Sequence, residues 1–121
     1  MEKAVGAMAA LLKNGSSDIR ASAACLLGVI GPKAAPTVED LAAALKDPDR
    51  NVRFNAQWAL ALIGSPAKRI IPQVGSSLTD PDPDIRAAAA EMLRTLGAMA
   101  EQSLPELIAA LEDKDPRVRA D

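Results

Sequence analysis

The feature of this sequence that most constrains its fold is an internal repeat with a period of 33 residues. An apolar residue followed by arginine recurs at that spacing, and the arginines are Arg20, Arg53, Arg86 and Arg119. Alanine, leucine and glycine columns share the step without a gap, and so do three aspartates, Asp47, Asp80 and Asp113. A fixed period of this size is typical of proteins that stack one small unit, each unit burying its apolar face against its neighbours.

Each unit is predicted to contain two helices. In DIRAAAAEMLRTLG, residues 84–97, the apolar side chains follow one helical stripe and the final glycine supplies a stop signal. In SLPELIAALED, residues 103–113, a second stripe follows a capping box made by Ser103 and Glu106. Thr37 with Asp40 is predicted to form a looser version of that box. Aromatic residues make up only 2% of the chain, which favours helices over strands.

These patterns predict an all-α fold, a right-handed α-solenoid of about three and a half helix pairs. We expect the chain to form one repeat domain over residues 1–121. Its parts are a partial repeat at 1–15, complete repeats at 16–48, 49–81 and 82–114, and a partial repeat at 115–121.

The stretch DPDPDIRAAAAE, residues 80–91, comes close to the spacing of a calcium-binding EF-hand loop. That loop needs glycine at its sixth position, which is Ile85 here, and Glu91 would lie about 13 Å along a helix from the cap. A simpler explanation is helix capping, because one column of the repeat holds four good N-cap residues: Ser16, Asp49, Asp82 and Asp115. The sequence therefore predicts helix caps and no metal site.

The motif that repeats is specific enough to indicate a family. LKDPDRNVRFNAQWALALIG, residues 45–64, and its equivalents share the pattern D-x-D-x-x-[VI]-R-x-x-A-x-x-x-L-x-x-[IL]-G. Ankyrin and tetratricopeptide repeats have similar periods, but their motifs are absent. The pattern resembles the short HEAT-like repeat, including the variety found in phycobilisome lyases, over essentially the whole chain. The resemblance implies a superhelix whose first helices line a convex face and whose second helices line a concave face.

The repeated charges are predicted to be structural. Arginines 20, 53 and 86 stand in one column, and aspartates 47, 80 and 113 stand in another at the edge of a loop. The arginines could bind an anion, but stacked Asp and Arg columns are better explained as a ladder that pairs within and between repeats.

Two surfaces are candidate binding sites. By analogy with the family, the concave face would bind a partner through small or mildly acidic residues: Asp40, Ala43, Gln73, Ser76, Glu106 and Ala109. Asp40, Gln73 and Glu106 also occupy the N3 position of their helices, so capping alone could explain them.

The convex face departs from the family pattern, because an apolar stripe replaces the usual polar residues. The stripe consists of Phe54, Trp58 and Leu62, beside Cys25 and Val29 of the previous repeat. Contiguous exposed apolar residues that include tryptophan usually mark an interface. The alternative is that Trp58 lies flat over the neighbouring helix and seals a seam.

Composition limits the function. The chain has no histidine or tyrosine and only one thiol, Cys25, so no nucleophile and base can be paired. A net charge of −2 without a basic stripe argues against nucleic acid. No apolar run approaches the roughly 20 residues of a membrane span. The single cysteine suits a reducing compartment, and we expect a cytoplasmic protein.

The sequence thus predicts a non-catalytic module that binds another protein or peptide, with no cofactor, metal, nucleic acid or membrane. Two alternatives stay open. One is a homo-oligomer joined through the Trp58 stripe, and the other is a lyase-like or accessory subunit of a larger enzyme complex that uses Cys25.

Overall fold

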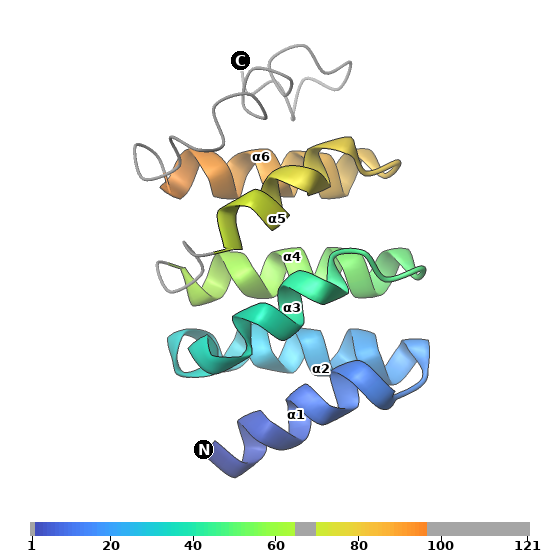
Figure 1. Ribbon diagram of the computed structural model, residues 1–121, viewed down its shortest axis with the longest axis vertical. Helices are drawn as coiled ribbons and strands as arrows, with labels where there is room; N and C mark the ends of the chain where they lie inside the picture. The colour runs from blue at the N-terminus through green and yellow to red at the C-terminus, as the bar shows by residue number, and fades with distance from the viewer. Residues whose placement is uncertain (1, 65–69, 97–121) are drawn as a thin grey trace. The chain divides into compact units, whose positions relative to one another are not determined.

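A computed structural model describes residues 2–64 and 70–96 of the chain. Within these ranges all regular structure is helical (Figure 1). The elements are α1 (Glu2–Asn14), α2 (Ser17–Ile30), the 3-10 helix η1 (Gly31–Thr37), α3 (Val38–Ala44), α4 (Arg50–Ile63), α5 (Ile71–Ser76), the 3-10 helix η3 (Ser77–Thr79) and α6 (Pro83–Leu96).

The chain divides into two compact units, Met1–Ala67 and Lys68–Asp121. In the first unit, α2 and α4 lie side by side in one layer, and α1 and α3 cross them in a second layer (Figure 1). In the second unit, α5 and η3 pack on α6. Each unit therefore contains the alternation of first and second helices that the repeat predicts.

The first helices begin at side-chain caps. The Ser16 hydroxyl accepts from the N–H of Ile19 at 3.4 Å, and an Asp49 carboxylate oxygen accepts from the N–H of Asn51 at 2.8 Å. Asp82 likewise accepts from the N–H of Asp84 at 2.8 Å, next to the start of α6. Each cap satisfies an N–H group that the first helical turn leaves without a partner. The fourth residue of this column, Asp115, lies outside the described residues.

The first helices of the first unit end at glycines with a left-handed backbone. Gly31 has φ 75° at the end of α2, and Gly64 has φ 78° at the end of α4. An L side chain at such a φ would meet its own backbone, so glycine is the residue that lets the chain leave the helix here.

The predicted capping box at Thr37 is wrong. The Thr37 hydroxyl is buried and donates to the carbonyl of Ala34 at 2.7 Å, and its side chain caps no N–H of α3. The physical reason is that η1 runs directly into α3, so Thr37 has φ −97° and ψ 6° and lacks the extended backbone with which an N-cap side chain reaches the next N–H groups. The second helices are also shorter than predicted at their C-terminal ends, because α3 ends at Ala44 and α5 gives way to the 3-10 helix η3 at Ser77.

The core of the first unit lies between the two layers. Leu27 of α2, Leu41 of α3 and Leu60 of α4 are fully buried there. Each buried leucine contributes about 1.5–3 kcal/mol relative to an exposed one. Alanines at 24 and 59 are also fully buried, and their small side chains let α2 and α4 approach closely.

One stretch of the described chain, Ser17–Ala44, is long and apolar enough by length and composition to cross a membrane. The expectation that no apolar run reaches this length therefore needs correction. The stretch is not one straight helix, because η1, with a proline at position 32 and another at 36, separates α2 from α3. Its leucines at 27 and 41 are core residues of the first unit.

Candidate functional site

The loop edge of the first unit is held by an ion pair between repeat columns. The Arg20 guanidinium donates from Nε to Asp47 Oδ2 at 2.8 Å and from Nη2 to Asp47 Oδ1 at 3.0 Å. Its third nitrogen donates to the carbonyl of Gly15 at 2.9 Å. A bidentate pair of this kind fixes both side chains, and here it ties the start of α2 to the loop that precedes α4.

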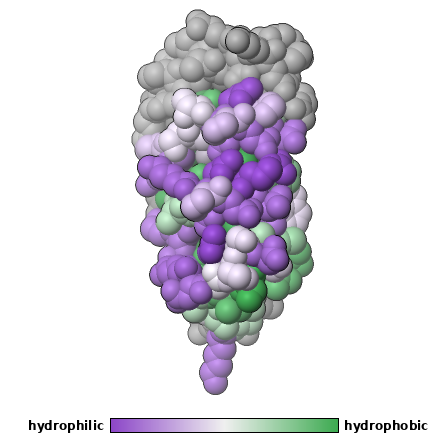
Figure 2. Space-filling view, turned by 90° about the vertical axis from the view of Figure 1, so that its right-hand side faces the viewer, coloured by the Kyte–Doolittle hydropathy of each residue, from purple (hydrophilic) through white to green (hydrophobic). Residues whose placement is uncertain are grey.

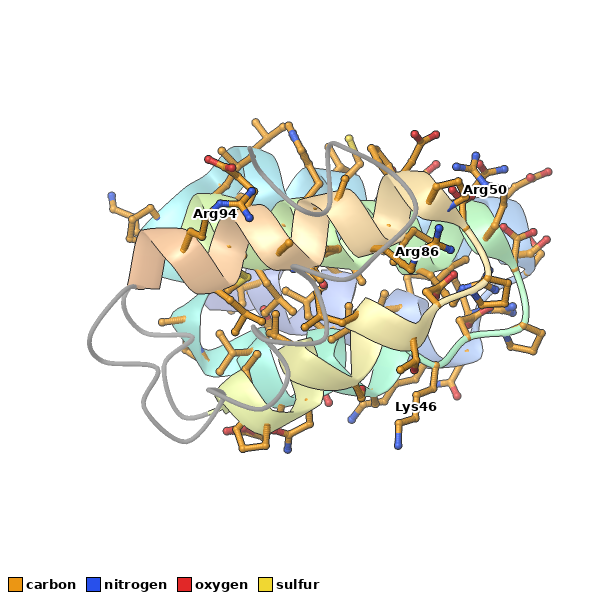
Figure 3. The ribbon with its side chains drawn as sticks, turned by 90° about the horizontal axis from the view of Figure 1, so that it is seen from above. Lys46, Arg50, Arg86 and Arg94 are labelled. Carbon is orange, nitrogen blue, oxygen red and sulfur yellow. The ribbon has the colours of Figure 1, made fainter. Side chains whose placement is uncertain are left out.

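The next arginines of the column bind backbone carbonyls. Arg53 donates to the carbonyls of Asp47 at 3.0 Å and Pro48 at 3.1 Å. In the second unit, Arg86 donates to the carbonyls of Asp80 at 3.0 Å and Pro81 at 3.2 Å, and it turns toward the loop before α6 (Figure 3). The surface around these loops is largely hydrophilic in each unit (Figure 2). In each case the arginine holds the loop that precedes its own helix, which is a structural role. The third aspartate of the column, Asp113, lies outside the described residues.

The ion pair between Arg20 and Asp47 shifts the pKa of both side chains. Burial of the Asp47 carboxyl raises its pKa, but hydrogen bonds from Arg20 and from the N–H of Asp49, with nearby positive charges, outweigh burial. The net pKa of Asp47 therefore lies below its ordinary value of 3.8. The pKa of Arg20 lies above its ordinary value, mainly because Asp47 accepts its hydrogen bonds. The pair is consequently charged at neutral pH.

The calcium-like stretch of the second unit is built as a helix start. Ile85, at the position where the loop would need glycine, is fully buried in α6. The Glu91 carboxylate pairs with the Arg94 guanidinium at 2.9 Å, one turn further along α6 (Figure 3). No group of three acidic or sulfur-bearing side chains that could hold a metal occurs in residues 2–64 and 70–96.

An apolar surface covers the outer side of α2 and α4. We call it the α2–α4 patch and define it as Cys25, Leu26, Val29, Phe54, Trp58 and Leu62. Val29 is 68% exposed and Trp58 39% exposed, while Leu26 and Leu62 are also exposed. Cys25 and Phe54 are half-buried. The sequence contains no charged residue from 21 to 32 or from 54 to 64, so the patch is electrically neutral.

Trp58 both covers a neighbour and faces solvent. A Cβ atom added to Gly28 would lie 2.8 Å from the Trp58 ring, so the indole rests directly against the backbone of α2. The two sequence hypotheses for Trp58, a seam between helices and an exposed contact residue, therefore describe two sides of one ring.

Leu26 is a patch residue that the sequence interpretation missed. Its equivalent in the next repeat, Ala59, is fully buried, whereas Leu26 is 48% exposed. Ile19 shows the same contrast with the buried Val52. Ala59 lies under α2, since its Cα would be 3.0 Å from a Cβ at Gly28. The repeat column of Leu26 and Ala59 alone would predict that Leu26 is buried. The exposure of this face of α2 is evident only from the packing of the helices in the structure.

The second layer carries two adjoining depressions. A larger one of about 570 Å³ lies between α1 and η1–α3, and a smaller one of about 330 Å³ lies beside it. Both are lined in part by Asp40, whose carboxylate pairs with Lys13 at 3.0 Å. Among the residues predicted for a concave binding face, the exposed ones are Ala43, Gln73 and Ser76. Glu106 and Ala109 lie outside the described residues.

Comparison with known proteins defines the class of protein. The fold is an α-solenoid made of stacked helix pairs, as predicted. Family models for HEAT repeats match residues 5–71 and 71–121. The chain therefore belongs to the HEAT repeat family. No curated protein matches it.

Two solved structures illustrate the fold. An engineered protein has a TM-score of 0.72 and 23% identity, over 95% of this chain and 57% of its own length. The complex of CpcE and CpcF of phycocyanin lyase from Nostoc sp. PCC7120 has a TM-score of 0.68 and 21% identity, over 98% of this chain and 74% of the other. The chain thus spans little more than half of the engineered protein, and at these identities the likeness concerns the fold.

Proposed function

We propose that this chain is a non-catalytic protein-interaction module that binds a partner protein through the α2–α4 patch. The observation that carries the proposal is that Leu26, Val29, Trp58 and Leu62 are exposed together on two adjacent helices. A neutral apolar surface with a tryptophan loses little on desolvation and gains from burial, which is the usual character of an interface centre.

Repeat equivalence supports a helical partner. The face of α4 equivalent to the exposed face of α2 holds Val52 and Ala59, and both are buried. In this architecture one helix covers the next, so a helix of the partner would cover Ile19 and Leu26 as α2 covers Ala59. HEAT repeats generally mediate contacts between proteins, and the phycocyanin lyase neighbour was solved as a complex of two proteins.

Photo-crosslinking from Cys25 tests the proposal, because this thiol lies within the patch and is the only one in the sequence. A benzophenone attached there would crosslink the partner in an extract of the source cells. The captured protein is then purified and titrated against the wild type, Leu26→Glu, Trp58→Glu and a control, Leu11→Glu. Leu11 is similarly exposed but lies on α1 in the other layer.

The proposal predicts binding that both patch variants lose and the control keeps. Equal binding by all four proteins would show that the patch is not the interface. Sedimentation equilibrium covers the alternative of a homo-oligomer: a wild type that self-associates, with a monomeric Trp58→Glu, would replace the partner protein with a second copy.

The absence of catalysis is part of the proposal, and so is a cytoplasmic location. Both rest on the sequence, which offers one cysteine and no histidine or tyrosine. The alternative of a lyase-like or accessory subunit would require the Cys25 thiol itself. Cys25→Ala separates the two, because it removes the sulfur and keeps the position apolar: an accessory function that depends on the thiol is abolished, whereas the interaction module still captures its partner.

A further inference from the structure

We infer that the groove between α1 and η1–α3 binds an extended peptide segment in which an acidic residue stands next to a bulky apolar one. We call it the α1–α3 groove, and it consists of the two adjoining depressions that share Asp40. It lies in the layer opposite the α2–α4 patch, so the inference does not depend on the proposed function.

The shape of the groove indicates an apolar side chain as occupant. The larger depression, of about 570 Å³, falls in the size range of ligand sites and is lined by Val5, Ala9 and Pro36. Gly6 lines it too, and a Cβ added there would meet nothing within 4 Å. Glycine within a helix costs about 0.5–1 kcal/mol relative to alanine, and no contact of the described chain requires it. A peptide backbone passing close to α1 would require it.

The charges of the groove indicate an acidic neighbour for that side chain. Each carboxylate lining the groove already pairs with a positively charged side chain: Asp40 with Lys13 at 3.0 Å, and Asp47 with Arg20 at 2.8 Å. The remaining charged residue is Lys33, exposed at the rim of the larger depression, and it has no hydrogen-bond or ion-pair partner within the described residues. An occupant with one carboxylate beside its apolar group would complete the charge balance.

The smaller depression favours a peptide over a compact small molecule. It continues the groove past Asp40 along Ala43 to Pro48, and Ala43 is small and exposed. Two depressions in a row suit alternate side chains, i and i+2, of an extended strand, because these project to the same side. We therefore expect the apolar residue in the larger depression and the following segment along the smaller one.

The test is an amide NMR titration of the full chain with three short probes. The first is acetyl-Gly-Glu-Leu-Ser-Gly-amide, the second has glutamine in place of its single glutamate, and the third has alanine in place of leucine. We expect saturable shifts at the amides of Gly6, Ala9 and Lys33 with the first peptide at concentrations up to about 1 mM. Both substituted peptides should bind at least fivefold more weakly.

Matched variants locate the site. Lys33→Glu should weaken binding at least fivefold, whereas Lys46→Glu should leave it unchanged, because Lys46 points away from the helices outside the groove (Figure 3). Gly6→Leu should abolish binding by filling the depression, and Ala7→Leu, exposed on the same helix, should not. Circular dichroism confirms that each variant is folded.

Three results would overturn the inference: no saturable shift with the first peptide, equal effects of Lys33→Glu and Lys46→Glu, or shifts confined to α2 and α4. Trp58→Glu serves as a separate arm. It should not alter peptide binding, so loss of the patch interaction and loss of the groove interaction can be told apart.

Discussion

At the scale of single residues, Asp47 joins two repeats with one carboxylate. Its oxygens accept from the Arg20 guanidinium, and Oδ1 also accepts from the N–H of Asp49 at 2.9 Å. The side chain thus ties the loop both to α2 and to the residue that caps α4. Asp80 repeats the second of these contacts, accepting from the N–H of Asp82 at 2.9 Å. The aspartate column is therefore explained by loop geometry in both described repeats.

We predict that Asp47→Asn lowers the free energy of unfolding at pH 7 by roughly 1–2 kcal/mol, because the amide accepts from Arg20 through one uncharged oxygen and places an NH2 donor where the second oxygen accepted. The pKa of Asp47 is lower in the folded chain than its ordinary value. Its contribution is therefore fully present above the unfolded pKa and is lost as the pH falls through the folded pKa. Urea unfolding at pH 7 and at pH 3 measures the two differences.

The control for this prediction is Asp18→Asn, which removes an exposed aspartate from the first turn of α2. It should lower stability at pH 7 by no more than about 0.5 kcal/mol, the value of a favourable helix-dipole contact. A difference between Asp47→Asn and the wild type that stays constant from pH 7 to pH 3 would contradict the assigned ion pair.

A second residue-scale prediction concerns a buried hydroxyl of the second unit. Ser77 is 4% exposed, and its hydroxyl has no hydrogen-bond partner among the described residues. The equivalent residue one repeat earlier, Ala44, is buried as well. Because the hydroxyl is desolvated without compensation, Ser77→Ala should leave the free energy of unfolding unchanged or raise it by up to about 1 kcal/mol.

The neighbouring serine provides the comparison. The Ser76 hydroxyl is exposed and donates to the carbonyl of Gln73 at 2.6 Å, so Ser76→Ala should not stabilise the chain through this mechanism. Thermal unfolding of the two variants checks the order. A clear loss of stability in Ser77→Ala would mean that the hydroxyl has a partner in the folded chain.

At the scale of the helix, the ends of α2 and α4 depend on backbone that only glycine adopts easily. Gly31→Ala should lower the free energy of unfolding by about 1–3 kcal/mol, because alanine at φ 75° strains the chain at the end of α2. Gly6→Ala should instead raise it by about 0.5–1 kcal/mol, since this glycine lies within α1 and its added Cβ meets open space. Chemical denaturation of both variants compares a required glycine with a permissive one.

How well the sequence predicts an element depends on whether the repeat specifies it. The caps at Ser16 and Asp49 follow from their column, because N-capping needs only the local chain. Thr37 was mispredicted for the opposite reason. Whether its hydroxyl caps α3 depends on the 3-10 segment before it, and the prolines that form η1 differ from repeat to repeat.

The candidate surfaces also divide into residues whose exposure the repeat predicts and residues whose exposure it does not. The exposure of Val29 and Leu62 follows from their place on the outward stripe of each first helix. The exposure of Leu26 could not be predicted in this way. Its repeat equivalent, Ala59, is buried because α2 covers it, and no first helix of the described chain covers Leu26. The α1–α3 groove was predicted in part, because Asp40 and Ala43 belong to the concave face expected from the family. The contributions of Gly6 and Lys33 could not be predicted, since these residues are not shared by the other repeats and their proximity arises only when α1 packs beside η1.

At the scale of the whole molecule, a small net charge and a neutral apolar patch should together control solubility. The chain has a net charge of −2 and an isoelectric point near 5.1. Charge repulsion between copies is therefore weak, and salts such as ammonium sulfate strengthen the burial of exposed apolar surface. Patch residues should consequently dominate the salting-out of this chain.

We predict that Trp58→Glu and Leu26→Glu raise the ammonium sulfate concentration needed for half-precipitation more than Leu11→Glu does. All three variants add one negative charge at an exposed apolar position, so a difference among them reports position and not net charge. The physical basis is that Trp58 and Leu26 both belong to the α2–α4 patch, whereas Leu11 lies on α1 in the other layer. Precipitation curves at pH 7 measure the midpoints, and equal midpoints for the three variants would show that net charge alone governs solubility and that the patch has no collective effect.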